Sequence, residues 1–551
     1  MKTIASVARK LNIPEKYLEL YGPYKAKVSL DILKTKKTRS GAKYILVTGI
    51  TPTHFGEGKT VTTIGLSMAL NRTAKKAVAC IRQPSLGPFF GVKGGGLGGG
   101  KSVLVPSDDI SLHFTGDIHA VGQAHNLAAA FLDNHLFRGN RLNIDLNKIF
   151  WHRVIDVNDR SLRNIRIGIG GDEFGVERST RFDITAASEI MAILALSESV
   201  PDMRKRLSRI IVALSKDMRP VTCEDLKVAG AMAALLGDAI KPNLVQTIEE
   251  TPCLIHAGPF ANITHGNSSI LADKIAMALA DFVVTEAGFG ADCGAEKFFD
   301  IKCRQSSFTP DCAVLVASIR ALKVHSGEFK AAVGKPLDRR IYKEDLESLR
   351  GGCANLEKQI ENVKLFGIPC VVAINKFASD TGREIDIVRD VALKSGSFDC
   401  VASELYKDGS PGGAKLAEAV LKACEQKANF KFLYPLGLSI KEKIDRIAKK
   451  IYGASSVSYS AAAEEDIAIF ERLGFGKLPI CMAKTHLSLS HDPNLKGRPI
   501  DFTLPVRDVR PSIGAGFLYV LCGKTLTMPS LPSHPIGEKI DIDSKGRMKI
   551  V

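Results

Sequence analysis

The feature that most constrains the fold is a glycine-containing turn at residues 47–60, placed between an apolar strand and a helix. Residues 43–46 form a short apolar run typical of a buried strand, and residues 62–70 have the apolar spacing of a helix. The sequence between them includes TPTHFGEGKT, residues 51–60. This order of strand, turn and helix predicts the first unit of a parallel α/β sheet.

The turn has the residue types of a phosphate-binding loop. Gly56 and Gly58 allow backbone N–H groups to point at a phosphate chain, Lys59 can reach the β and γ phosphates, and the Thr60 hydroxyl can hold Mg²⁺. Thr53 stands where the usual pattern has its first glycine, and an ordinary strand-to-helix turn is the alternative reading. The nucleotide-binding residues predicted are Thr53, His54, Phe55, Gly56, Glu57, Gly58, Lys59 and Thr60.

Length and composition predict a multidomain globular protein. The chain has 551 residues, 45% hydrophobic and 24% charged, and its apolar runs are shorter than the ~18 residues of a membrane span. Its N-terminus is read as a first structural helix, with an organellar presequence as the second choice. The twelve cysteines are scattered without metal-binding spacing, so we expect reduced thiols and a cytoplasmic location.

The net charge of +16 raises the question of a polyanionic partner. The excess is spread along the chain without a recognised nucleic-acid module, so we expect neither nucleic acid nor membrane as a partner. Anionic small substrates account for it equally well, and most of these residues are expected to be solvated surface lysines and arginines.

A second apolar run, residues 77–81, is followed directly by Arg82. In a parallel sheet the carboxyl ends of the strands carry the ligand, so Arg82 is expected near the phosphates, where its guanidinium can bind a planar oxyanion. A surface arginine before a proline turn is the alternative. Two further strand ends offer polar candidates, the group Asn262, His265 and Asn267 and the pair Glu286 and Asp292, the latter for contacts to Mg²⁺-bound water.

Other polar stretches are given structural readings. The glycine-rich residues 91–101 are expected to pack backbone against a ligand or to close over one, with a flexible linker as the alternative. The histidines between residues 113 and 135 lack the spacing of a transition-metal site. Asn375 and Lys376 end an apolar strand as in the NKxD motif of GTPases, but Ala378 replaces the aspartate, so guanine specificity is not supported.

Several long blocks, in order, resemble the monofunctional formate–tetrahydrofolate ligases, also called formyltetrahydrofolate synthetases. The blocks are TPTHFGEGKT, RQPSLGPFFGVKGGGLGGG, HFTGDIHAVGQAHN, PFANITHGNSS and DFVVTEAGFGADCGAEKFFDIKC. The similarity extends from the first helix to residue 543. It implies the ATP-dependent ligation of formate to tetrahydrofolate through formyl phosphate, in one-carbon metabolism. It also implies a homotetramer activated by a monovalent cation, K⁺ or NH₄⁺.

The resemblance assigns roles to individual residues. Lys59 and Arg82 form the catalytic set, with Arg82 gripping formyl phosphate, and Thr60 is the Mg²⁺ ligand. Phe377 and Tyr406 match the two aromatics that sandwich the pterin ring. The chain departs from the family twice: Tyr406 stands where tryptophan is common, and Gln83 stands where an acidic residue usually follows the arginine.

The expected fold is α/β, with a large P-loop parallel-sheet nucleotide-binding domain and two smaller α/β domains. The predicted boundaries are residues 1–365, with an inserted subdomain at about 130–245, then 366–465 for folate binding and 466–551 at the C-terminus. Two other functions stay open from the residues alone. They are a dethiobiotin-synthetase-like ligase that forms another acyl phosphate, and a P-loop switch ATPase with a macromolecular partner.

Overall fold

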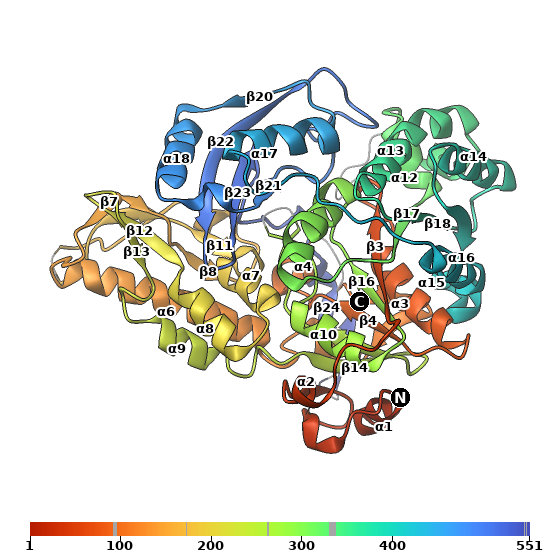
Figure 1. Ribbon diagram of the computed structural model, residues 1–551, viewed down its shortest axis with the longest axis horizontal. Coiled ribbons are helices and arrows are strands. Elements are labelled where there is room, and N and C mark those ends of the chain that lie inside the picture. The colour runs from red at the N-terminus through yellow and green to blue at the C-terminus, as the bar shows by residue number, and fades with distance from the viewer. Residues whose placement is uncertain are drawn as a thin grey trace.

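A large mixed sheet with helices on both faces organises the molecule (Figure 1). The computed structural model describes residues 1–91, 96–171, 173–261, 264–329, 338–544, 546 and 548–550. In these ranges the sheet order is β1-β2-β14-β15-β4-β16-β3-β17-β18-β19, and β15 through β19 in that order are parallel. The bounds are β1 Leu18–Leu20, β2 Ala26–Val28, β14 Asn243–Thr247, β15 Pro252–Ile255, β4 Ala77–Ile81, β16 Phe282–Glu286, β3 Lys43–Gly49, β17 Cys312–Ala317, β18 Cys370–Asn375 and β19 Asp399–Ser403.

The apolar strands are buried on both faces, which explains why they read as unbroken apolar runs. In β3, Tyr44 and Leu46 join one core cluster, whereas Ile45 and Val47 join another on the opposite face. The first face is covered by α10 (Ile270–Leu279) and α13 (Leu346–Lys364), and the second by α3 (Lys59–Asn71) and α16 (Ala414–Glu425). The predicted α/β class with a large parallel sheet is therefore confirmed.

Residues 117–240 form most of a second core beside the large sheet, in the orange and yellow lobe of Figure 1. The long helix α6 (Asp117–Phe137) packs on α9 (Ala229–Leu235), and β13-β12-β7 form a small sheet. Here β7 is Ile144–Ile149, β12 Ile211–Ser215 and β13 Pro220–Thr222, with α7 at Glu189–Leu196 and α8 at Val200–Ser208.

The C-terminal part has its own sheet, drawn in blue in Figure 1, with the order β20-β22-β23-β21. The helices α17 (Ile440–Ile447) and α18 (Ala461–Arg472) accompany β20 (Ser456–Tyr459), β21 (Ile480–Ala483), β22 (Thr503–Ser512) and β23 (Phe517–Cys522). The predicted boundary at 365/366 falls between α13 and β18, and that at 465/466 falls inside α18. Because β18 and β19 continue the sheet of β3, the division into domains stays a prediction. In the described ranges we find no helix with the length and apolarity needed to cross a membrane.

A half-buried glutamate joins the second core to the C-terminal part. Oε1 of Glu189, the first residue of α7, accepts hydrogen bonds from the backbone N–H groups of Gly514 at 2.7 Å and Ala515 at 3.2 Å. Burial raises the pKa of the Glu189 carboxyl to about 8, although the two amide donors oppose the shift. Both donors use the same oxygen, so the other oxygen can carry the proton.

The raised pKa of Glu189 predicts a pH-dependent stability. Between about pH 5 and 8 the folded protein keeps a proton that the unfolded chain has released, so the free energy of unfolding should fall as pH rises through that window. Replacing Glu189→Gln, which stays neutral, should reduce this slope, measured as the thermal unfolding midpoint from pH 5 to 8. The exposed Glu224→Gln is the control. Equal slopes in wild type and Glu189→Gln would refute the assignment.

Candidate functional site

The predicted site residues follow neighbouring parallel strands at one edge of the large sheet. Arg82 follows β4, Glu286 ends β16, residues 50–58 follow β3, Phe377 follows β18 and Tyr406 follows β19. Adjacent strands lie about 4.8 Å apart, so this row spans roughly 25 Å. Its centre is the 50–58 turn, with Arg82 two strands to one side and Phe377 two strands to the other.

The 50–58 turn needs glycine at two positions. Gly56 and Gly58 have φ angles of 74° and 88°, in the left-handed region that side chains disfavour. A Cβ on Gly58 would also lie 2.3 Å from Nδ2 of Asn375, at the end of β18. That Asn375 amide donates to the Glu57 carbonyl at 3.1 Å, so the turn is bonded directly to the strand that leads to Phe377.

The Glu57 side chain folds back and hydrogen-bonds to Thr53 within the same turn. Its buried Oε1 accepts from the Thr53 backbone N–H at 2.6 Å and from the Thr53 hydroxyl at 3.1 Å. The hydroxyl of Thr53, which stands at the usual glycine position, therefore helps to fix the loop. Oε2 of Glu57 lies 3.4 Å from Lys59 Nζ, and the Lys59 stem lies within 3.3 Å of where a Cβ on Gly49 would be.

The remaining predicted nucleotide-binding residues differ in exposure. His54 and Gly56 are exposed at the tip of the turn, and Thr60 is half-buried in the first turn of α3. Phe55 is half-buried and packs against the small cluster of Val324, Phe329 and Ile341. The turn thus exposes His54 and Gly56, keeps Lys59 and Thr60 half-buried, and packs Phe55 inward.

A buried polar network supports the turn. The Thr51 N–H donates to Asn355 Oδ1 at 3.1 Å, and Nδ2 of Asn355 and Nε2 of Gln359 each donate to the Thr51 hydroxyl at 2.9 Å. Gln359 Nε2 also reaches Asp292 Oδ1 at 2.7 Å, and Asp292 Oδ2 pairs with Lys484 Nζ at 2.8 Å. The network connects the turn through α13 to the C-terminal sheet. Asp292 is therefore engaged in a buried ion pair, and its contact with Mg²⁺-bound water stays a prediction.

Arg82 is held in a partly buried position. Its Nη1 donates to the Pro259 carbonyl at 3.0 Å, and Nη2 lies 3.9 Å from Glu286 Oε1. Burial lowers the pKa of the guanidinium, and Glu286 opposes this. A Cβ on Gly288 would lie 2.8 Å from Nη2, and one on Gly290 would lie 3.2 Å from the Ile50 carbonyl. The segment 288–290 therefore packs against both Arg82 and the start of the 50–58 turn.

The other predicted polar group lies beside Arg82, except that Asn262 falls outside the described residues. Asn267 donates to the Glu286 carbonyl at 3.1 Å. His265 is fully buried, and its pKa is lowered well below the usual value by burial and by nearby cations that include Lys302 and Arg82. His265 is therefore a neutral imidazole in this setting.

The two predicted pterin-stacking aromatics follow adjacent strands, β18 and β19, in which Asn375 pairs with Ser403. The Phe377 ring is half-buried, and its backbone N–H donates to Asp380 Oδ2 at 2.8 Å. The Tyr406 side chain is 54% exposed and lies on the glycine-rich segment, because a Cβ on Gly99 would be 3.0 Å from its ring. Residues 92–95 of that segment lie outside the described part of the chain.

Two residues at this edge, Asn375 and Arg320, make contacts that the sequence did not predict. Asn375 was compared with a guanine-binding motif, whereas its amide secures the Glu57 carbonyl. Arg320 was not predicted as a site residue. It lies three residues after β17, much as Arg82 lies one residue after β4. Its guanidinium carbon is 3.6 Å from the Phe377 ring centroid. A systematic search for cations after each apolar strand could have found it.

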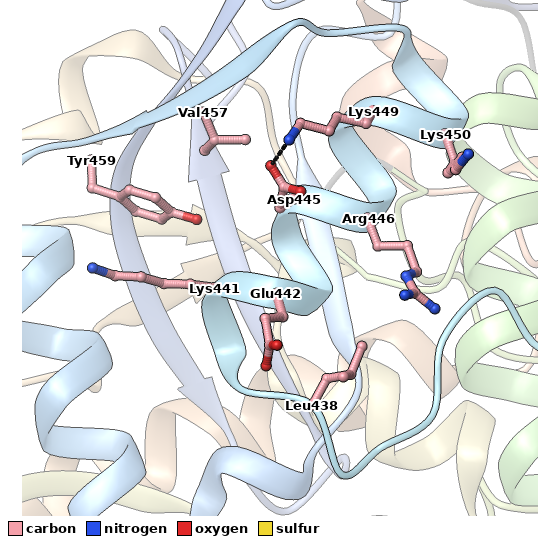
Figure 2. Close-up of a pocket in the computed structure, with 9 residues that line it drawn as sticks. All are labelled: Leu438, Lys441, Glu442, Asp445, Arg446, Lys449, Lys450, Val457 and Tyr459. Atoms are coloured by element: carbon pink, nitrogen blue, oxygen red, sulfur yellow. Dashed lines mark ion pairs between the residues drawn. The ribbon is translucent and has the colours of Figure 1, made fainter.

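A groove of about 500 Å³ lies elsewhere, along α17 and β20 (Figure 2). It is open, most of its lining residues are charged, and Asp445 in α17 pairs at 2.9 Å with Lys449, two residues past the end of that helix. The described residues that line it do not include the predicted site residues; they are Leu438, Lys441, Glu442, Asp445, Arg446, Lys449, Lys450, Val457 and Tyr459.

Comparison with known proteins gives a full-length match. The family model described as formate–tetrahydrofolate ligase matches residues 1–550. A formate–tetrahydrofolate ligase of Roseiflexus castenholzii is 54% identical over 549 residues, covering 100% of this chain and 97% of that protein. The ligases of Desulforamulus reducens and Saccharopolyspora erythraea are 54% and 53% identical, covering 99% and 100% of this chain and 96% and 97% of theirs.

The ion pair of Asp292 with Lys484 gives a stability prediction. Both side chains are at most 1% exposed, so Lys484→Met should leave a buried carboxylate without its cation and destabilise the fold by about 3–5 kcal/mol. Adding Asp292→Asn should restore part of the loss. Urea and thermal unfolding measure both effects, with the exposed Lys477→Met as control. A Lys484→Met protein as stable as this control would show that the pair is dispensable.

Proposed function

The chain belongs to the formate–tetrahydrofolate ligase family, and we propose that it carries out that family's reaction at the carboxyl edge of its large sheet. The protein is a ligase that joins formate to tetrahydrofolate in an ATP-dependent reaction. The proposed site rests on one observation, that the 50–58 turn contacts both neighbours in the row. On one side the Asn375 amide, two residues before Phe377, donates to the Glu57 carbonyl. On the other side Ile50 lies against the segment 288–290, which packs on Arg82.

The proposed first step activates formate. A formate oxygen attacks the γ phosphorus of ATP, the bond to the β–γ bridging oxygen breaks, and ADP and formyl phosphate result. Lys59 and the N–H groups of the 50–58 turn hold the triphosphate, and Arg82 neutralises charge on the transferring phosphoryl group. The 3.4 Å contact between Lys59 and Glu57 holds the ammonium at the mouth of the turn.

The second step transfers the formyl group. The N10 amine of tetrahydrofolate attacks the formyl carbon, the carbon–oxygen bond to phosphate breaks, and 10-formyltetrahydrofolate, phosphate and a proton are released. Phe377 and Tyr406 stack on the pterin ring, which is worth roughly 1–3 kcal/mol per stacked base in comparable sites. The contacts of Tyr406 support this role. Its ring packs on Gly99 and its backbone on Gly100, where side chains would prevent so close an approach.

Mg²⁺ fits the proposed nucleotide site. The ion usually takes one or two protein oxygens together with phosphate and water oxygens, so a single hydroxyl beside the phosphates suffices. Thr60, in the first turn of α3 and next to Lys59, supplies that oxygen. Among the described residues no group of three or more His, Cys, Asp or Glu side chains could hold a metal. When bound, Mg²⁺ would offset phosphate charge.

Three further family properties are part of the proposal. The first is activation by K⁺ or NH₄⁺, and the second is assembly as a homotetramer. The third is a division of labour among residues 1–365 for nucleotide and formyl phosphate, 366–465 for folate, and 466–551 as a C-terminal α/β domain. A dethiobiotin-synthetase-like ligase and a switch ATPase are not favoured, because the family match covers the whole chain.

An isotope experiment tests the proposed route. With ¹⁸O-labelled formate, ATP and tetrahydrofolate, one formate oxygen should be found in the released phosphate, because it becomes the bridging oxygen of formyl phosphate. Phosphorus NMR or mass spectrometry of the phosphate measures the label, and a reaction without tetrahydrofolate is the control. Unlabelled phosphate formed together with 10-formyltetrahydrofolate would exclude formyl phosphate as the intermediate.

Loss of the Arg82 charge should impair chemistry far more than binding of ATP. We expect Arg82→Gln to lower kcat on the order of 10³-fold or more, because an arginine on a transferring phosphoryl group contributes that much, while the KM for ATP changes little. Steady-state kinetics measures both quantities, and the exposed Arg219→Gln serves as the matched control. A kcat within tenfold of wild type would remove Arg82 from the catalytic set.

A further inference from the structure

One guanidinium lies among three aromatic rings at the edge of the large sheet. Arg320 is the second residue of α12 (Ile319–His325), which follows β17. Its guanidinium carbon lies 3.6 Å from the ring centroid of Phe377, and 5.8 Å from the centroids of Phe55 and of Tyr342. The rings come from the 50–58 turn, from the end of β18 and from the short helix η6 (Arg339–Tyr342). Arg320 therefore joins three segments that are far apart in sequence.

Aromatic rings are the closest neighbours of this charge, and the Asp380 carboxylate lies near enough for Arg320 to oppose the rise of its pKa on burial. Within the part of the chain that the structure describes, Arg320 forms no ion pair, and its buried Nε donates no hydrogen bond. A cation close to the face of an aromatic ring is attracted by the ring quadrupole, and the attraction is stronger where water is excluded. At 3.6 Å the contact with Phe377 is the closest of the three, so Arg320 packs most directly against that ring.

Strand order brings Arg320 next to the two proposed stacking aromatics. β17, β18 and β19 are neighbours, so Arg320, Phe377 and Tyr406 follow adjacent strands in that order at one edge of the sheet. The guanidinium carbon lies 3.6 Å from the Phe377 ring centroid, so Arg320 packs directly on the ring proposed to stack on the pterin.

We propose that Arg320 is a positioning residue that couples nucleotide binding at the 50–58 turn to stacking of tetrahydrofolate on Phe377. Phe55 lies between exposed His54 and Gly56 in the turn, while its side chain packs against the cluster of Val324, Phe329 and Ile341. A nucleotide that orders the turn orders Phe55, Phe55 holds the guanidinium, and the guanidinium holds the Phe377 ring. This inference rests on the proposed function of the turn and of Phe377.

Coupling of this kind is reciprocal, so each ligand should tighten the binding of the other by the same factor. The measurement is the Kd of tetrahydrofolate for the full-length protein, by calorimetry, with and without MgADP. In the wild type we expect MgADP to lower this Kd about tenfold, within the usual range of such couplings. In Arg320→Met the change should be less than about twofold, with the Kd of MgADP alone nearly unchanged.

Variants separate positioning from a general loss of structure. Arg320→Lys keeps the charge but lacks the planar fork, so it should retain part of the coupling. Phe55→Leu should reduce the coupling from the nucleotide side, and the double variant with Arg320→Met should lose no more than either single variant. The exposed Arg383→Met, which breaks only a surface pair with Glu344, is the control and should keep the full coupling. Thermal unfolding midpoints check that each variant is folded.

The outcomes are distinguishable. A wild type that catalyses the ligation but binds tetrahydrofolate equally with and without MgADP would overturn this inference and leave the proposed function intact. So would an Arg320→Met protein with the full tenfold effect. A wild type without ligase activity would instead overturn the proposed function itself.

Discussion

Parallel pairing of six neighbouring strands is the constraint on which the rest of the structure depends. Because β4, β16, β3, β17, β18 and β19 all run in one direction, their carboxyl ends meet at one edge. Residues that are more than 300 positions apart, such as Arg82 and Tyr406, thereby come to share one row. The unbroken apolar strands provide this alignment, since burial on both faces leaves polar side chains to the ends of strands.

Burial of polar groups behind this edge makes the arrangement specific. Thr51, Asn355, Gln359, Asp292 and Lys484 satisfy one another in a region from which water is excluded. Each buried polar atom left without a partner would cost about 1–3 kcal/mol, so the network tolerates few alternative packings. It also means that the C-terminal sheet, which supplies Lys484 but none of the predicted ligand contacts, helps to set the shape of the 50–58 turn.

Local patterns predicted the units of the fold but not the contacts between them. The apolar runs at residues 43–46 and 77–81 correspond to β3 and β4, and the apolar strand predicted to end at Asn375 and Lys376 corresponds to β18, since two-sided burial leaves a continuous apolar signal. The glycines of the turn were recognisable because their conformation excludes other residues. The partners of Arg320 and Lys484 were not predictable, because such contacts depend on strand order, which a single sequence does not encode at any one position. The roles of Lys59, Thr60, Arg82, Phe377 and Tyr406 stay predictions that rest on the resemblance and on this shared edge.

The glutamine at position 83 changes the charge balance at one end of the row. Its backbone N–H donates to the Ala257 carbonyl at 2.6 Å, and its buried Oε1 accepts no hydrogen bond within the described residues. The acidic residue that the resemblance implies at this place would put a second carboxylate near Arg82, in addition to Glu286, whose Oε1 lies 3.9 Å from Arg82 Nη2. Burying a charge without a partner is far more costly than burying a neutral amide. With the neutral Gln83, Glu286 is the carboxylate that pairs with Arg82, and less of the guanidinium charge is neutralised by the protein. The positive charge that remains is available to attract formate and the transferring phosphoryl group, which are both anions.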